Sequence, residues 1–181
     1  SDIFSMLYQV AAMVGEAEQG ARRIAQMQAD LRAMQAAVAA RLAAGARRPT
    51  VFFEEWDEPH ISCIRWVSEL MTIAGGDDCF PELAQEPMGK QRIIADGATI
   101  VRRAPDIVLG SWCGKKFRPE KVAAREGWTD VPAVREAQLF EIKSADILQP
   151  GPAALTDGVQ QMHRIFMQWM DKPLPVRGAS A

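Results

Sequence analysis

Cysteine is scarce in this sequence, and its positions match no metal or redox motif. Cys63, Cys79 and Cys113 lie far apart, whereas structural zinc sites and redox centres place cysteines only a few residues from one another. The odd count leaves at least one thiol unpaired. His60 and His163 are also isolated and fit no HExxH pattern. We therefore expect no metal site.

An excess of charge of one sign and a long apolar run are missing as well. The chain has 21 basic and 23 acidic residues, a net charge of −2, which offers no general attraction for nucleic acid or anionic membranes. No apolar run approaches the roughly 18 residues of a membrane span, and no signal-peptide pattern opens the chain. With 48% hydrophobic residues in 181 positions, one folded domain with an appendage is expected.

The first 48 residues are predicted to be helical. Apolar residues in 2–14 recur at helical spacing, and Gly15 ends the pattern. A longer amphipathic helix follows over 17–44, with an apolar seam along one side and Gly45 placed to cap it. This helix is either a rigid strut or a helix that lies on its own domain. We assign residues 1–48 to a helical segment.

From residue 49 onward, strand and helix patterns alternate. Apolar runs predict strands at 50–56, 92–94, 106–109 and 138–142. Helical spacing predicts helices at 63–74, 97–104, 119–125 and in a closing segment that ends at Met170. This order is typical of an α/β fold with a mostly parallel, Rossmann-like sheet flanked by helices. We assign residues 49–171 to that domain and 172–181 to a flexible tail.

The loop at 111–116 is the first candidate site, because ligands of open α/β sheets bind at the carboxyl ends of strands. Its glycines are spaced too closely for a P-loop, and Lys116 stands where that motif requires a hydroxyl. Trp112 is expected at the loop tip, where a large ring favours ligand contact. The cations that follow either meet anionic ligand groups or form a solvated helix face; they are Lys115, Lys116, Arg118, Lys121 and Arg125.

Catalysis has weak support in the sequence. Glu54 and Glu55 could act as acid or base if burial raised a pKa, and Cys113 lies near two lysines that could favour its thiolate. No nucleophile signature accompanies them. We expect a protein that is not an enzyme, has no catalytic residues and uses no cofactor, while an enzyme that uses Cys113 or Glu55 stays the alternative.

Four segments together resemble the substrate-binding proteins of bacterial ABC importers with a helical backbone, particularly the cobalamin-binding branch. They are PTVFFEEWDEP (49–59), WVSELMTIAGGDDCFPEL (66–83), IADGATIVRRAPDIVLGSWCGKK (94–116) and GWTDVPAVREAQLFEIKSADILQPGPAAL (127–155). In that family two α/β lobes joined by one long helix hold a ligand between them. The resemblance implies that 17–44 is the backbone helix, that 50–170 is the C-terminal lobe of a truncated receptor, and that the protein is periplasmic.

The resemblance also implies a site and partners. The cleft-lining loops would be 55–61, 111–116 and 144–149. The expected ligand contacts are Glu55, Trp56, His60, Trp112, Cys113, Lys115 and Gln149. The expected ligand is a corrinoid carried as cargo, with haem or a ferric siderophore as the alternative. A helix-mediated interaction module with no transport role is a further alternative.

Two interaction surfaces follow from the resemblance. Family members dock an arginine of the ABC permease with a glutamate, but the matching position here is Ala98, so this partner is expected without that contact. Because the N-terminal lobe is missing, the seam from Ile24 to Leu42 should expose apolar surface, and such patches usually become interfaces. We expect self-association through residues 1–44.

Overall fold

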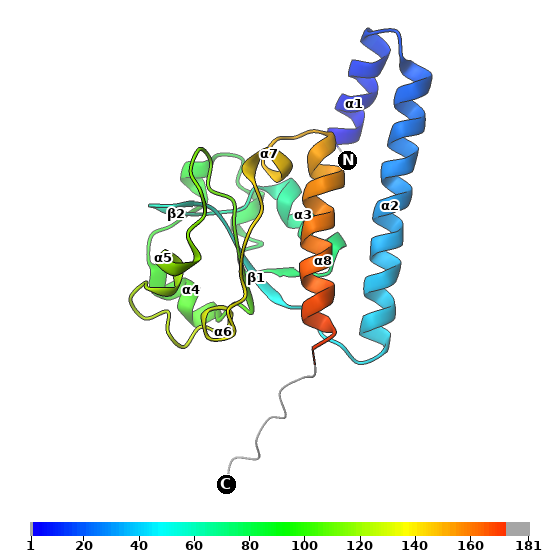
Figure 1. Ribbon diagram of the computed structural model, residues 1–181. Coiled ribbons are helices and arrows are strands. Elements are labelled where there is room, and N and C mark those ends of the chain that lie inside the picture. The colour runs from blue at the N-terminus through cyan, green and yellow to red at the C-terminus, as the bar shows by residue number, and fades with distance from the viewer. Residues whose placement is uncertain (1, 173–181) are drawn as a thin grey trace.

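The computed structural model describes residues 2–172 and places a two-helix arm beside an α/β lobe (Figure 1). The arm consists of α1 (Asp2–Met13) and α2 (Ala17–Ala43), which are joined by a short turn and run antiparallel. The two helices touch closely at Gly20, where an added Cβ would lie 2.3 Å from the Cβ of Ala11. Glycine at this position therefore allows the backbones to meet.

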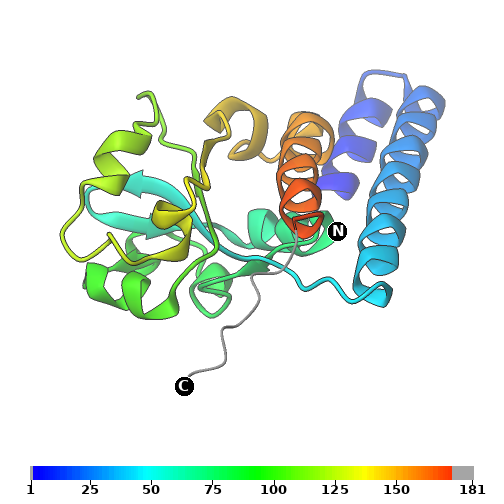
Figure 2. The ribbon, with the colours of Figure 1, turned by 60° about the horizontal axis from the view of Figure 1, so that its bottom comes forward.

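The C-terminal half of α2 packs on the lobe. Leu31, Met34 and Val38 are buried in one hydrophobic cluster with α3 (Arg65–Ala74) and α8 (Val159–Met170). Helix α8 stands between the sheet and α2 (Figure 2). From Leu31 to Val38 the seam is thus covered by the chain's own helices, so this part does not expose the expected apolar surface. Ile24, at the start of the seam, is only partly buried. Most of the exposed large apolar side chains lie on and just after α1, namely Met6, Tyr8, Val10, Met13 and Val14, and two others, Met88 and Ile93, lie on the lobe.

The lobe is built on a mostly parallel sheet with the strand order β4-β2-β1-β5-β6, and β3 also pairs with β1. Its strands are β1 (Thr50–Asp57), β2 (His60–Ser62), β3 (Asp77–Asp78), β4 (Ile93–Ile94), β5 (Ile107–Gly110) and β6 (Leu139–Glu141). Strand β1 runs parallel to β3 and β5, and β5 runs parallel to β6. Antiparallel pairing is confined to β1 with β2 and β2 with β4. The predicted α/β fold is confirmed.

Both faces of the central strands are buried, which explains their nearly continuous apolar sequence. Val51 and Phe53 of β1 face the cluster shared with α3, α8 and the arm, whereas Phe52 faces a second cluster around Trp128. The helices that contribute to this second cluster are α4 (Gly97–Arg103), α5 (Pro119–Ala123) and α6 (Pro132–Arg135). The sheet is therefore sandwiched between two apolar layers, with its strand ends free to carry polar groups.

Short elements account for the differences from the predicted secondary structure. Residues 57–62, expected as a loop, turn back into β2, and the expected loop at 144–149 contains α7 (Ser144–Ile147). Segments this short span too little of a period to be detected in sequence, and they form through contacts with neighbouring elements. Three more short elements are 3-10 helices at Leu83–Gln85 and Gly89–Gln91 and a π-helical segment at Ala154–Gly158.

Two remaining predictions concern membrane-spanning helices and the C-terminal tail. No helix within residues 2–172 is long and apolar enough to cross a bilayer. The predicted tail at 172–181 lies outside the described residues except for Lys172.

Candidate functional site

The ends of β1 and β5 bring together two segments that are far apart in the sequence. Parallel pairing of Glu54 with Gly110 sets the end of β1 beside the loop that follows β5, and the Ser111 N–H donates to the Glu54 carbonyl at 2.9 Å. Gly110 lets this loop fold back, because a Cβ there would lie 1.9 Å from the Phe117 ring. The strand ends are where ligands of such sheets bind, so we take them as the candidate site.

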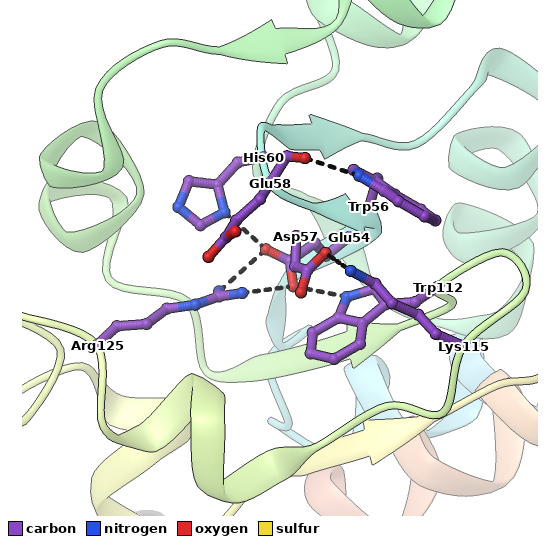
Figure 3. A network of polar contacts seen from close by, with 8 residues as sticks. All are labelled: Glu54, Trp56, Asp57, Glu58, His60, Trp112, Lys115 and Arg125. Atoms are coloured by element: carbon purple, nitrogen blue, oxygen red, sulfur yellow. Dashed lines mark hydrogen bonds and ion pairs between the residues drawn. The ribbon is translucent and has the colours of Figure 1, made fainter.

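A fully buried carboxylate lies at the base of this site (Figure 3). Glu54 Oε1 is 2.9 Å from His60 Nδ1 and 2.9 Å from Arg125 Nη1. Glu54 Oε2 accepts hydrogen bonds from Trp112 Nε1 and Arg125 Nη2, each at 3.0 Å. A buried charge is tolerated only when it is paired and hydrogen-bonded, and Glu54 meets both conditions. Its oxygens are thus occupied by the chain itself.

The ammonium of Lys115 lies at the lip of the site between two indole rings. Its Nζ is 4.2 Å from the centroid of the Trp56 ring and 5.3 Å from that of Trp112, and it pairs with the Asp57 carboxylate. Trp56 Nε1 donates to the Glu58 carbonyl at 2.8 Å. Burial by itself would raise the pKa of Asp57, but its hydrogen bond with Lys115 and other favourable contacts outweigh burial and lower it.

Two hollows open beside this lip and share Trp112 and Lys115. The smaller, about 290 Å³, is also lined by Asp57, Glu58, His60, Lys121 and Arg125. The larger, about 440 Å³, is also lined by Gly114, Lys116, Glu141, Lys143, Ser144 and Ala145. Three of the predicted site residues therefore line these hollows, namely His60, Trp112 and Lys115. Trp56 lies next to them through its contact with the Lys115 ammonium.

Glu55 lines neither hollow, because its carboxylate is engaged elsewhere in the chain, and ligand contact by this residue stays a prediction. Its carboxylate pairs with the buried guanidinium of Arg92 and accepts a hydrogen bond from the Ile64 N–H at 3.0 Å, before the first residue of α3. Burial raises the pKa of Glu55, although Arg92 opposes the shift. Adjacent residues of a strand point to opposite faces, so only Glu54 faces the site.

Three other predicted ligand contacts differ in their exposure, namely Trp112, Cys113 and Gln149. Trp112, expected at the loop tip, is only 5% exposed and packs edge-on against Phe117, with ring centroids 5.0 Å apart. Its edge still lines both hollows. Cys113 and Gln149 are exposed, and neither of them lines the two hollows. Ligand contact by these three residues stays a prediction.

The cationic cluster of the sequence is largely paired within the chain. Lys115 pairs with Asp57, Arg118 with Glu120, and Arg125 with Glu54. Among residues 2–172, Lys116 and Lys121 take part in no ion pair. Sequence reasoning missed the role of Arg125, although an acidic residue inside an apolar strand is a signal that a buried counter-ion must exist.

Two of the three thiols, Cys63 and Cys79, are buried, whereas Cys113 is exposed. Within residues 2–172, no group of three or more histidine, cysteine or acidic side chains is arranged to hold a metal ion. Burial raises the pKa of both Cys63 and Cys79, and the nearby Asp78 adds to each shift. These two thiols are consequently protonated at neutral pH and lack the thiolate that nucleophilic attack requires.

Comparison with known proteins gives a family and a fold. The sequence model of a family described as periplasmic binding protein matches residues 1–145. No curated protein matches the sequence at a significant level. Three similar solved structures are a periplasmic binding protein from Veillonella parvula (18% identity, TM-score 0.70), a heme-binding protein from Roseiflexus sp. RS-1 (21%, 0.66) and a vitamin B12 binding protein from Vibrio cholerae (18%, 0.62).

These structural matches extend over most of this chain but over only part of the other proteins. They cover 90%, 90% and 87% of this chain, and 55%, 62% and 56% of the respective structures. The chain thus spans a little over half the length of the proteins it resembles. At these identities the likeness establishes a shared fold.

Proposed function

The chain belongs to the periplasmic binding protein family, and on this premise we propose that it forms one ligand-binding lobe of a solute receptor for an ABC importer. The proposal is supported above all by the paired hollows at the carboxyl ends of β1 and β5, which are the concave, polar-edged kind of surface that holds small ligands. A receptor of this kind carries its ligand without transforming it. The lobe would act in the periplasm, and 1–48 and 49–171 would be its helical segment and its binding domain.

We propose a corrinoid as the cargo. The periphery of cobalamin carries mainly neutral amides, whereas haem and many ferric siderophores present anionic groups. Lys115 and Arg125 are already neutralised by Asp57 and the buried Glu54, so the smaller hollow offers paired charges and the Trp112 indole. Such a surface suits a large ring with neutral substituents better than a polyanion.

Haem or a ferric siderophore is the alternative, and one observation favours it. Lys116 and Lys121 line the two hollows and pair with no carboxylate among residues 2–172. Each could form a charge-assisted hydrogen bond to a ligand carboxylate, worth about 1.5–3 kcal/mol. The solved relatives include both heme-binding and vitamin B12 binding proteins, so the fold leaves this choice to the charges of the site.

The permease is a proposed partner that would need a contact other than the missing glutamate. Ala98 occupies the first turn of α4, and the nearby Asp96 caps this helix, with its carboxylate accepting from the Ala98 N–H at 2.9 Å. Asp96 also pairs with Arg102. The Asp96 carboxylate is exposed, but a permease arginine that docks on it would have to compete with the Ala98 N–H and with Arg102.

A titration followed by absorbance tests the cargo. We expect the chain to bind cyanocobalamin more tightly than haem, but weakly, because one wall of a cleft supplies part of the contacts while the entropy cost of capture stays. Nanomolar cobalamin binding by the chain alone would contradict this view of the cleft. Tighter binding of haem, lost in the Lys116→Ala/Lys121→Ala variant but kept in the Lys90→Ala control at an exposed lysine, would favour the alternative.

A further inference from the structure

Lys115 holds its ammonium in surroundings that are suited to binding an organic cation. The Trp56 and Trp112 rings lie 4.2 and 5.3 Å from Nζ, within the distance at which a ring face attracts a positive charge. The Asp57 carboxylate completes the enclosure, and its side chain is only 13% exposed. Two indoles and a shielded carboxylate form the kind of aromatic cage that recognises ammonium groups.

The walls of this cage are held by contacts that do not involve Lys115. Trp56 is fixed by its hydrogen bond to the Glu58 carbonyl, and Trp112 by its hydrogen bond to the buried Glu54. Asp57 ends β1 and pairs across the hairpin with His60. Removal of the Lys115 side chain should therefore leave Trp56, Trp112 and Asp57 in the same positions.

Lys115 itself is the least constrained member of the group. Its side chain is 39% exposed, and it lies in the loop between β5 and α5, next to Gly114 with φ +74° and open space around its Cα. An ammonium on a long flexible stem can exchange a weak ion pair for water with little change in free energy. The lysine can thus leave the cage without disturbing the buried network below.

We propose that Trp56, Trp112 and Asp57 form a binding site for an alkylammonium or quaternary ammonium group of a ligand, and that Lys115 occupies this site as an internal placeholder that such a ligand displaces. The surrounding charges agree with a cation. Without Lys115, Asp57 and Glu58 face Lys121, while Arg125 is matched by Glu54. The smaller hollow, counted without Lys115, then carries a small excess of negative charge, which attracts a cation and repels a carboxylate. The site extends the proposed function but does not depend on the importer role.

Choline and its neutral isostere 3,3-dimethylbutan-1-ol test the proposal on the chain as it stands. The indole N–H signals of Trp56 and Trp112 report binding in NMR titrations of the unaltered chain and of Lys115→Ala. We expect choline to shift both signals and to bind Lys115→Ala about tenfold more tightly than the unaltered chain, because no internal ammonium competes. The neutral alcohol should bind at least about tenfold more weakly than choline, as charge provides the attraction.

Two control variants separate the cage from general effects. Lys90→Ala removes an exposed lysine that lines neither hollow, and it should bind choline as weakly as the unaltered chain. Asp57→Asn in the Lys115→Ala background should weaken choline binding about tenfold, because it removes the carboxylate wall. Saturating choline should also shift the indole N–H signals of Trp56 and Trp112 in the unaltered chain, which would show that the ligand displaces Lys115 without any mutation.

The proposal would be overturned by equal choline affinity in Lys115→Ala and the unaltered chain, or by equal affinity for choline and the neutral alcohol. Loss of structure in Lys115→Ala, seen by circular dichroism, would contradict the independence of the cage from its lysine. If the chain binds choline but not cobalamin, the ammonium site is supported and the corrinoid proposal is contradicted. The two proposals can therefore be tested separately.

Discussion

Glu54 and Glu55 are adjacent and chemically identical, yet they have different roles because a strand directs them to opposite faces. Glu54 holds together the site-facing network of His60, Trp112 and Arg125. Glu55 joins Arg92 and the start of α3. Each carboxylate is satisfied by partners that are distant in the sequence. The site is therefore supported by two buried charge pairs, one directly beneath it and one behind the hairpin.

Arg92→Met is expected to destabilise the lobe strongly. Arg92 is 3% exposed and bonds to the Ser62 and Glu86 carbonyls as well as to Glu55. Removing one partner of a buried pair leaves the other charge uncompensated, which costs about 3–5 kcal/mol of the free energy of unfolding. Urea denaturation at pH 7 measures this loss.

A control and a pH series make this prediction specific. Arg65→Met removes an exposed ion pair with Glu69 and should change the free energy of unfolding by less than about 1 kcal/mol. Burial raises the pKa of Glu55 and Arg92 opposes this shift, so removal of Arg92 should raise the pKa further. The loss in Arg92→Met should be full only above this higher pKa and should shrink as the pH falls and Glu55 becomes protonated. A loss independent of pH would indicate packing rather than charge.

The β1–β2 hairpin is the element that aims the site residues. Its pairing register shifts between Glu54 and Trp56, and such a bulge bends the strand and redirects its side chains. The hairpin carries Trp56 and Asp57 on one strand and His60 on the other. Pairing of β2 with both β1 and β4 fixes this geometry, so the hairpin depends on the rest of the sheet.

The helix arm provides a test of close packing between elements. Gly20→Ala would raise helix propensity by about 1 kcal/mol, but its Cβ would overlap the Cβ of Ala11. Overpacking of this kind costs about 1–3 kcal/mol, so we expect α1 to loosen from α2. Faster amide hydrogen exchange across residues 2–13 would show it.

A second substitution distinguishes the contact from a local effect. Ala11→Gly in the Gly20→Ala background removes the opposing Cβ and should restore slow exchange of the α1 amides, apart from the helix-propensity cost of the new glycine. Slow exchange in Gly20→Ala alone would contradict the prediction, because it would mean that the two helices can move slightly apart without loss of stability in α1.

At the level of the whole molecule, the arm combines a covered helix with an exposed one. Helix α2 buries its seam on the lobe, while Met13 and Val14 at the end of α1 are 85% and 68% exposed. A groove between α1 and α2, lined by Phe4, Tyr8 and Ile24 among others, adds to this apolar surface. The region available for association is thus α1 and its groove, which includes Ile24 at the start of the seam, rather than the covered part of the seam from Leu31 to Val38.

We expect the chain to self-associate through this surface at high concentration. Apolar patches of this kind commonly form interfaces, so sedimentation velocity should show a mass that rises with concentration. Met13→Lys/Val14→Lys should restore the monomer, whereas Met88→Lys, at an exposed methionine on the lobe, should not. A monomeric mass across the micromolar range would refute the prediction.

The sequence alone predicted the alternation of helices and strands and a helix that begins at Pro119, and it placed the candidate site after β1 and β5. These features depend on periodicity and on local backbone chemistry, which are present in contiguous residues. Tertiary structure alone decided the burial of Trp112, the placement of Lys115 between two indoles, the separation of Glu54 from Glu55 and the covering of the α2 seam. Each of these depends on which distant side chain supplies a counter-charge or an apolar partner, and spacing along the chain does not encode that choice.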